Sequence, residues 1–231
     1  MCFSATASFT LAAALVPAGL LCLKYARSLG IRWIGLAVYP LAFSLQQALE
    51  GLVWVGLDRD APGLVNAGAH GYLFFSHLFW LMWVPFSVLL LQFGREASNR
   101  APLTMLLIAG SLLGLVLYSP ILAMTDPVPI AVQSGSLAYD IPLLFGGEPV
   151  RFGLKLAYFA IMTSSLFLSA DRRIQGFGAL IAVSFIVVEF WFSHAFISVW
   201  CFLAATLSLC VLVIFMLEAR MQRSKVLPLP Q

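Results

Sequence analysis

The feature that most constrains this chain is the length of its uncharged apolar runs. From residue 174 to residue 217 the sequence is almost continuously apolar, and "EFWFSHA", which contains Glu189 and His194, is its only polar cluster. At 1.5 Å per residue this run would make about 66 Å of helix, which is about twice the thickness of the hydrocarbon core of a bilayer. The run must therefore turn once, and we expect the turn at the polar cluster.

The composition indicates that lipid is the solvent for most of the chain. Only 10% of the residues are charged and 61% are hydrophobic, whereas a soluble domain carries about 25% charged residues. Seven segments are long and apolar enough to cross a membrane: approximately 6–23, 33–56, 69–93, 103–124, 152–169, 175–191 and 197–217. We therefore predict an all-α fold, a bundle of seven transmembrane helices that forms a single integral membrane domain over residues 1–231.

The basic residues predict how this bundle is oriented. Ten of the thirteen Lys and Arg residues follow odd-numbered segments, and three lie at the opposite end. The ten are Lys24, Arg27, Arg32, Arg95, Arg100, Arg172, Arg173, Arg220, Arg223 and Lys225, and the three are Arg59, Arg151 and Lys155. Because cytoplasmic loops carry the excess of basic residues, we expect the N-terminus outside the cell membrane and the C-terminus in the cytoplasm.

With this orientation, the outer end of the bundle collects the three histidines, two glutamates of the apolar segments and two of the four cysteines. The residues of interest near or within this end are Cys2, Ser4, Glu50, His77, Glu189, His194 and Cys201. Ionisable groups inside a membrane are costly and are usually functional or paired. We therefore predict one polar site that opens to the outer leaflet and faces the exterior or periplasm.

The second segment carries a polar patch on one helical face. In "SLQQALEG", Gln46 and Gln47 lie four and three residues before Glu50, and both spacings place side chains on the same face of a helix. Glutamines alone would be explained by hydrogen bonds between helices, but the glutamate would not. Pro40 precedes the patch, so we also expect a kink there.

The residue types at the outer end suggest a transition-metal site. Imidazole with thiolate or carboxylate forms typical sites for zinc, iron or copper, and we expect His77 and His194 as ligands together with Cys2 or Cys201. Glu50 or Glu189 would then be the general base, or would orient a ligand. The chain has no HExxH or CxxC motif, so the ligands would come from different helices. Alternatively, Cys2 and Cys201 form a disulfide in an oxidising exterior.

The longest loop, at about residues 126–150, contains a hairpin signal. "PIAVQSGSLAYDIP" has two short apolar runs around Ser134, Gly135 and Ser136, a pattern typical of a β-hairpin. If this external loop folds down over the bundle, it would bring Asp140 to the site as a further catalytic carboxylate.

Several short motifs together resemble a family of small, uncharacterised bacterial multi-pass membrane proteins. The motifs are the opening Met-Cys-Phe-Ser, "QQALEG", "SHLFW", "YDIP" and "SVWC", and members of the family open with Met-Cys-Phe-Ser or Met-Cys-Trp-Ser. The family has no established activity. The resemblance implies that the positions of interest are Cys2, Ser4, Glu50, His77, Asp140, Trp200 and Cys201.

These observations favour a metal-dependent membrane enzyme that acts on a lipid-like or small amphipathic substrate. One alternative is a non-catalytic protein that binds or senses a lipid, a quinone or, with less support, a haem. Another is an accessory subunit of a larger membrane complex. Membrane lipids are the expected partners, a protein partner or a homo-oligomer stays open, and the small net charge of +3 gives no indication of nucleic acid.

Overall fold

The computed structural model describes residues 4–93, 99–124, 126–141 and 147–226 of the chain, and these are mostly helical. The elements in chain order are α1 (Ala5–Leu29), η1 (Ile31–Trp33), α2 (Ile34–Ala37), α3 (Tyr39–Asp58), α4 (Pro62–Phe74), η2 (Phe75–Phe79), α5 (Trp80–Leu91), α6 (Arg100–Leu122), β1 (Ile130–Gln133), β2 (Ser136–Tyr139), α7 (Glu148–Phe167), α8 (Arg172–Trp191), η3 (Ser193–Ala195), α9 (Phe196–Leu207) and α10 (Leu209–Val226).

Six helical segments of the described chain are long and apolar enough to cross a membrane. They are Ala5–Leu29, Pro62–Leu91, Arg100–Leu122, Pro149–Phe167, Arg172–Trp191 and Ser193–Gln222. The 20-residue helix α3 is also long, but it carries the polar patch of the second predicted segment. The helical fold class is therefore confirmed. The turn expected in the last apolar run is also confirmed, because η3 separates α8 from α9.

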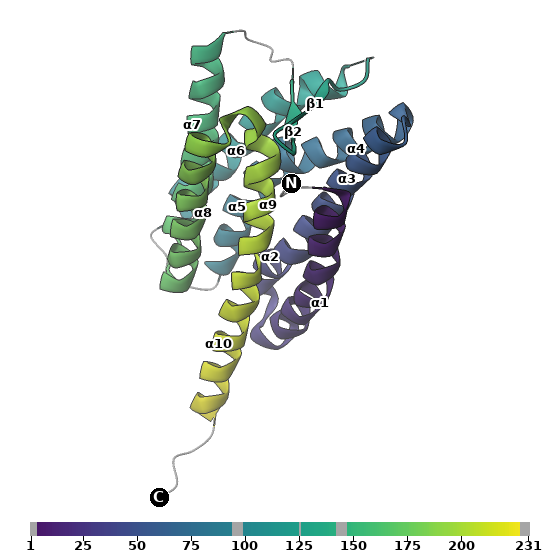
Figure 1. The fold of residues 1–231 in the computed structure, drawn as a ribbon. Helices are drawn as coiled ribbons and strands as arrows, with labels where there is room; N and C mark the ends of the chain where they lie inside the picture. Colours follow the sequence, from purple (N-terminus) through teal and green to yellow (C-terminus); the bar gives the residue numbers. More distant parts are fainter. Residues whose placement is uncertain (1–3, 94–98, 125, 142–146, 227–231) are drawn as a thin grey trace, which may run out of the picture.

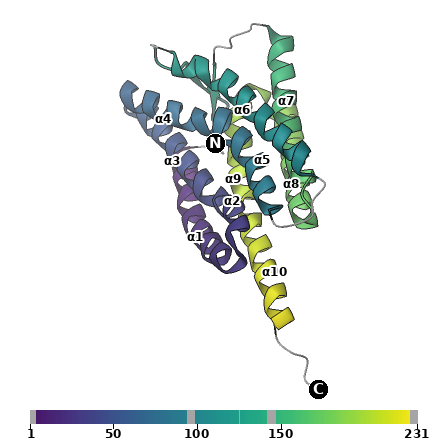
Figure 2. The ribbon, with the colours of Figure 1, turned by 180° about the vertical axis from the view of Figure 1, so that it is seen from behind.

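The helices form two sides with α5 and α9 between them. Helices α1 and α3 pack together on one side, and α7 and α8 pack together on the other (Figure 1; Figure 2 shows the same arrangement from behind). Helix α10 continues in the direction of α9 beyond the rest of the bundle. The β1–β2 hairpin lies at the opposite end, beside α4 and the start of α7. This hairpin end is the one that the sequence predicts to be outer.

The second predicted segment is interrupted where its sequence contains a proline. Helix α2 ends at Ala37, and α3 begins at Tyr39 with Pro40 in its first turn. Proline is tolerated in the first turn of a helix, where its missing N–H would have no partner, but it restricts the residue before it. The expected kink is therefore present as a break that divides the segment into a short and a long helix.

The third predicted segment contains one turn of π-helix. Within the helical run Pro62–Leu91, η2 is a π-helix that holds His77 between α4 and α5. Helix α6 lies against this region through Gly110 and Gly114, two small residues four apart. A side chain at Gly110 would collide with the carbonyl oxygen of Leu81, and one at Gly114 would lie 3.2 Å from that of His77. Small residues let helix backbones approach closely, so these glycines hold the π-turn against α6.

The hairpin has the position and the turn that the sequence predicts. Ile130 pairs with Tyr139 and Gln133 with Ser136, which leaves Ser134 and Gly135 as a two-residue turn with positive φ angles of 51° and 77°. Two successive positive φ angles are typical of the tight turns that match the twist of a hairpin. Strand β2 is largely buried and β1 is mostly exposed, so the hairpin covers the bundle with β2.

We predict that Gly110→Ala destabilises the protein by about 1–3 kcal/mol, because the added methyl group must displace the backbone of α5. Gly176→Ala on α8 is a matched control, since a Cβ at Gly176 meets no atom within 4 Å. The control should be neutral or stabilising by up to about 1 kcal/mol, as expected for alanine in a helix. Thermal unfolding of the two variants in one detergent tests this, and equal stability would contradict the close packing of α5 on α6.

Candidate functional site

A cavity of about 940 Å³ opens at the hairpin end of the bundle. Its wall is formed by the hairpin, the first half of α7, the turn between α8 and α9, and η2. Ligand sites are typically clefts of about 300–1,000 Å³ with mostly apolar walls and a few polar groups. Six of the residues that we singled out from the sequence line this cavity: His77, Asp140, Glu189, His194, Trp200 and Cys201. These residues come from η2, the end of the hairpin, α8, η3 and α9.

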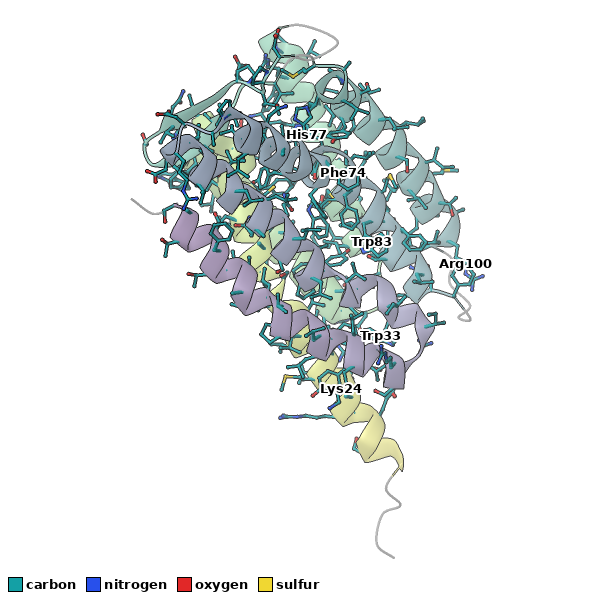
Figure 3. The ribbon with its side chains drawn as sticks, turned by 90° about the vertical axis from the view of Figure 1, so that its right-hand side faces the viewer. Lys24, Trp33, Phe74, His77, Trp83 and Arg100 are labelled. Atoms are coloured by element: carbon teal, nitrogen blue, oxygen red, sulfur yellow. The ribbon has the colours of Figure 1, made fainter. Side chains whose placement is uncertain are left out.

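The π-turn positions His77 at the cavity wall. A π-helix turn is rare, and such turns occur frequently at functional sites. The imidazole Nδ1 lies 2.8 Å from the hydroxyl of the neighbouring Ser76, which also lines the cavity. Figure 3 shows His77 toward the hairpin end of the molecule and Lys24 toward the opposite end. Among the described residues, no hydrogen bond joins His77 to Glu50.

Two ion pairs of different quality lie on the cavity wall. Lys155 on α7 donates to both carboxylate oxygens of Glu189 on α8, at 2.9 Å each, and its ammonium lies 4.9 Å from the ring centroid of Phe196. Both side chains of this pair are about two-thirds buried. Arg151 and Asp140 approach only to 3.8 Å, and the Asp140 side chain is 81% exposed. The wall therefore carries two positive and two negative side chains, and only the Lys155–Glu189 pair is well formed.

Aromatic side chains form the deep wall of the cavity around Trp200. The Trp200 ring contacts those of Tyr158, Phe185 and Phe196, with centroids 5.2–5.5 Å apart. Its indole N–H donates to the Ser184 hydroxyl at 3.2 Å. Buried aromatic rings prefer such edge and offset contacts, so Trp200 is fixed in one orientation. The deep wall is thus a rigid apolar surface.

A second polar group of residues lies behind the cavity wall, around Glu50. This side chain is 2% exposed, and its carboxylate accepts a hydrogen bond of 2.6 Å from the hydroxyl of Ser198 on α9. Gln46 accepts a hydrogen bond of 2.7 Å from the indole N–H of Trp80. We call Gln46, Gln47, Glu50, Tyr72, Tyr139 and Ser198 the Glu50 cluster. Neither Glu50 nor the two glutamines lines the cavity, and Tyr139 is the one member of the cluster that does.

Tyr139 and Cys201 lie between the two polar regions. Both line the cavity, and both lie close enough to Glu50 to interact with it electrostatically. The Tyr139 ring stacks on that of Tyr72, with centroids 5.3 Å apart and an angle of 13° between the planes. Burial raises the pKa of the Tyr139 phenol well above its ordinary value, and the charges of Glu50 and Cys201 raise it further. Tyr139 is therefore a neutral hydroxyl at physiological pH.

The remaining predicted residues have other surroundings. The Ser4 hydroxyl accepts a hydrogen bond from the Ala7 N–H at 3.2 Å and caps α1, which is a structural role. Cys201 carries a free thiol, and Cys2 lies outside the described residues. Within the described part of the chain, no group of three or more His, Cys, Asp and Glu side chains could hold a metal ion. A metal site that includes Cys2 stays a prediction.

Several residues of the cavity and the cluster are missing from the sequence prediction. Lys155 and Arg151 stand in the fifth predicted segment or at its start, and a cation opposite Glu189 could have been found as a possible partner. Ser198 and Tyr72 carry no signal, because serine and tyrosine are common in apolar helices. Tyr139 could have been found from the hairpin, since it precedes Asp140 on the strand that packs inward.

Fold and site together define a helical protein with several helices apolar enough to span a membrane and a cavity at one end of its bundle. A family model matches residues 1–227, and the chain belongs to this family of unknown function (DUF6629). The expected membership of an uncharacterised family is therefore confirmed. No curated protein and no solved structure matches the chain.

We predict that Lys155 and Glu189 are energetically coupled. In a double-mutant cycle with Lys155→Met and Glu189→Gln, the coupling energy should be about 0.5–1 kcal/mol, because the pair is bidentate and partly shielded from water. The cycle of Arg151→Met and Asp140→Asn is the control, and its coupling should be close to zero because that pair is long and exposed. Unfolding of the detergent-solubilised variants gives both values. Additive effects at Lys155 and Glu189 would contradict the pairing.

Proposed function

We propose that the protein is a seven-span protein of the cytoplasmic membrane that binds an amphipathic molecule in the cavity at its outer end. The cavity itself carries this proposal. Its volume suits a small-molecule ligand, its deep wall is aromatic, and its charged residues come from α7, α8 and the end of the hairpin. An amphipathic ligand would place its apolar part against Trp200 and its polar head beside the ion pairs.

The charges on the wall favour a zwitterionic head group. Arg151 and Lys155 supply two positive charges, and Asp140 and Glu189 supply two negative charges. A head group with one phosphate and one ammonium could exchange partners with these pairs and leave no charge uncompensated. The phosphate would bind the basic side chains, and the ammonium would bind Glu189 and the Phe196 ring, where Lys155 now lies. An anionic head would instead meet two carboxylates.

The state of the two glutamates favours binding over catalysis as the proposed activity. Glu189 is engaged in a bidentate ion pair with Lys155, and Glu50 lies behind the cavity wall rather than on it. A general base must reach its substrate within hydrogen-bonding distance, and neither carboxylate is free to do so in this arrangement. A metal-dependent enzyme would also need a ligand set beyond the one that the described residues supply.

The distribution of basic residues supports the proposed orientation. If the ten-to-three asymmetry of Lys and Arg follows the positive-inside rule, the cavity faces the exterior. We predict that, in intact cells, a membrane-impermeant maleimide labels Gly63→Cys at the hairpin end and not Ser28→Cys at the other end. Both positions are exposed. The native cysteines are first replaced by serine, so that the introduced cysteine is the only one that can be labelled. The reverse labelling pattern would exclude the orientation.

We predict that filling the cavity weakens ligand binding. Ala138 is a half-buried residue of β2 on the cavity wall, and Ala138→Trp should lower the affinity for a short-chain phosphatidylethanolamine by about tenfold or more. Ala67→Trp, on an exposed face of α4 away from the cavity, is the matched control and should leave the affinity unchanged. Native mass spectrometry of the purified protein measures both affinities.

Two outcomes of this experiment would contradict the proposal. Equal affinities for the Ala138→Trp and Ala67→Trp variants would exclude the cavity as the binding site. Tighter binding of a short-chain phosphatidylglycerol than of the phosphatidylethanolamine would exclude the zwitterionic head group, because the former carries a net negative charge.

A further inference from the structure

Glu50 differs from the other buried or partly buried carboxylates of the described chain in having no basic partner. Asp171 and Glu218 pair with Arg173, and Glu189 pairs with Lys155. The Glu50 carboxylate instead accepts a hydrogen bond from the neutral hydroxyl of Ser198. The ionisable groups that face it are Tyr72, Tyr139 and Cys201, and each of these is neutral or negative.

This environment requires an added positive charge if the carboxylate is ionised. An isolated charge in a low-dielectric interior is very costly, and buried charges are paired or coordinate an ion. Inside a membrane the same rule makes an unpaired carboxylate a candidate for an ion or proton site. One carboxylate carries one negative charge, so a single monovalent cation or a single proton would neutralise it.

The oxygen atoms around Glu50 favour the cation. The Ser198 hydroxyl bonds to the Glu50 carboxylate, and Tyr72, Tyr139 and Gln47 lie close enough to interact with this carboxyl. Each of these four side chains contains an oxygen atom, so that with the carboxylate the cluster has five oxygen-bearing groups. Small hard cations prefer carboxylate, amide-carbonyl and hydroxyl oxygens. A proton on Glu50 would use only one of these oxygens.

Two members of the cluster are buried without hydrogen-bond partners. Gln47 is 0% exposed and Tyr139 is 9% exposed, and neither the amide group of Gln47 nor the hydroxyl of Tyr139 has a partner among the described residues. Buried polar groups almost always have a partner, and each exception needs an explanation. An ion that binds the Gln47 carbonyl and the Tyr139 hydroxyl would supply the missing contacts.

We propose that Glu50, Gln47, Tyr72, Tyr139 and Ser198 form a binding site for one sodium ion. The ion would join α3, α4, the hairpin and α9, which contribute these side chains. Since Glu50 and Gln47 do not line the cavity, the ion would lie behind the proposed ligand site and share only Tyr139 with it. Tyr139 lies on the wall between the cavity and Glu50.

Direct binding of ²²Na⁺ to the purified full-length protein tests the site. Wild type should bind one ion per chain, and Glu50→Gln and Tyr139→Phe should each weaken binding by about tenfold or more, since each removes an oxygen ligand. Glu50→Gln keeps an oxygen that can accept from Ser198, and Tyr139→Phe removes only an unpartnered hydroxyl, so both variants should fold. Asp58→Asn, an exposed carboxylate of the same helix, is the control and should bind as wild type does.

Thermal unfolding gives a second readout that does not require an isotope. In NaCl, relative to choline chloride of equal ionic strength, the Tm of wild type should rise by roughly 3–6 °C for each tenfold increase in sodium concentration above Kd. Glu50→Gln and Tyr139→Phe should lose this rise. The proposal is overturned if wild type binds no ²²Na⁺, if both variants bind it undiminished, or if stability responds to pH and not to sodium, which would identify a proton as the occupant.

Discussion

The structure depends on the exclusion of water from the space between its helices, because a buried polar group without a partner is costly there. Several serines solve this locally, and the hydroxyls of Ser87, Ser165 and Ser184 each donate to a backbone carbonyl three or four residues earlier. Longer polar side chains cannot do so and must reach another helix. Some of these residues, such as Gln92 and Arg173, lie at the end opposite the hairpin, and others gather at the hairpin end, where several elements meet. The cavity and the Glu50 cluster are both consequences of this gathering.

The sequence predicted the parts of this arrangement that are local. Apolar run lengths located the helices, "EFWFSHA" located the turn before α9, and Ser134 and Gly135 located the hairpin. The partner of each polar side chain was not predictable, because it depends on how the helices rotate and pack. Glu189 bonds to a lysine 34 residues earlier, and Glu50 bonds to a serine 148 residues later. The sequence thus predicted that Glu189 and Glu50 lie at one end of the bundle. It did not predict that Glu189 lies on the cavity wall and Glu50 behind it.

Those environments assign different chemistry to two carboxylates at the same end of the bundle. Glu189 lies in a charge-balanced wall that water and ligands can reach. Glu50 lies behind that wall, among hydroxyl and amide groups that carry no formal charge. The first arrangement can exchange one ion pair for another, whereas the second can only gain or lose a single positive charge. Tyr139 and Cys201 lie between these two environments, and Tyr139 belongs to the hairpin rather than to the bundle.

The π-turn at Phe75–Phe79 has a consequence for how this segment tolerates changes in length. A π-turn accommodates one residue more than the α-helix around it, and each residue of an α-helix advances the helical face by about 100°. The sequence after η2 is therefore shifted by one position relative to the sequence before it, although both halves of the helical segment pack on the same bundle. Removing one residue from this turn would restore an uninterrupted α-helix with both apolar faces aligned. The segment therefore contains a point at which a single-residue deletion is compatible with a continuous helix while His77 loses its place at the cavity.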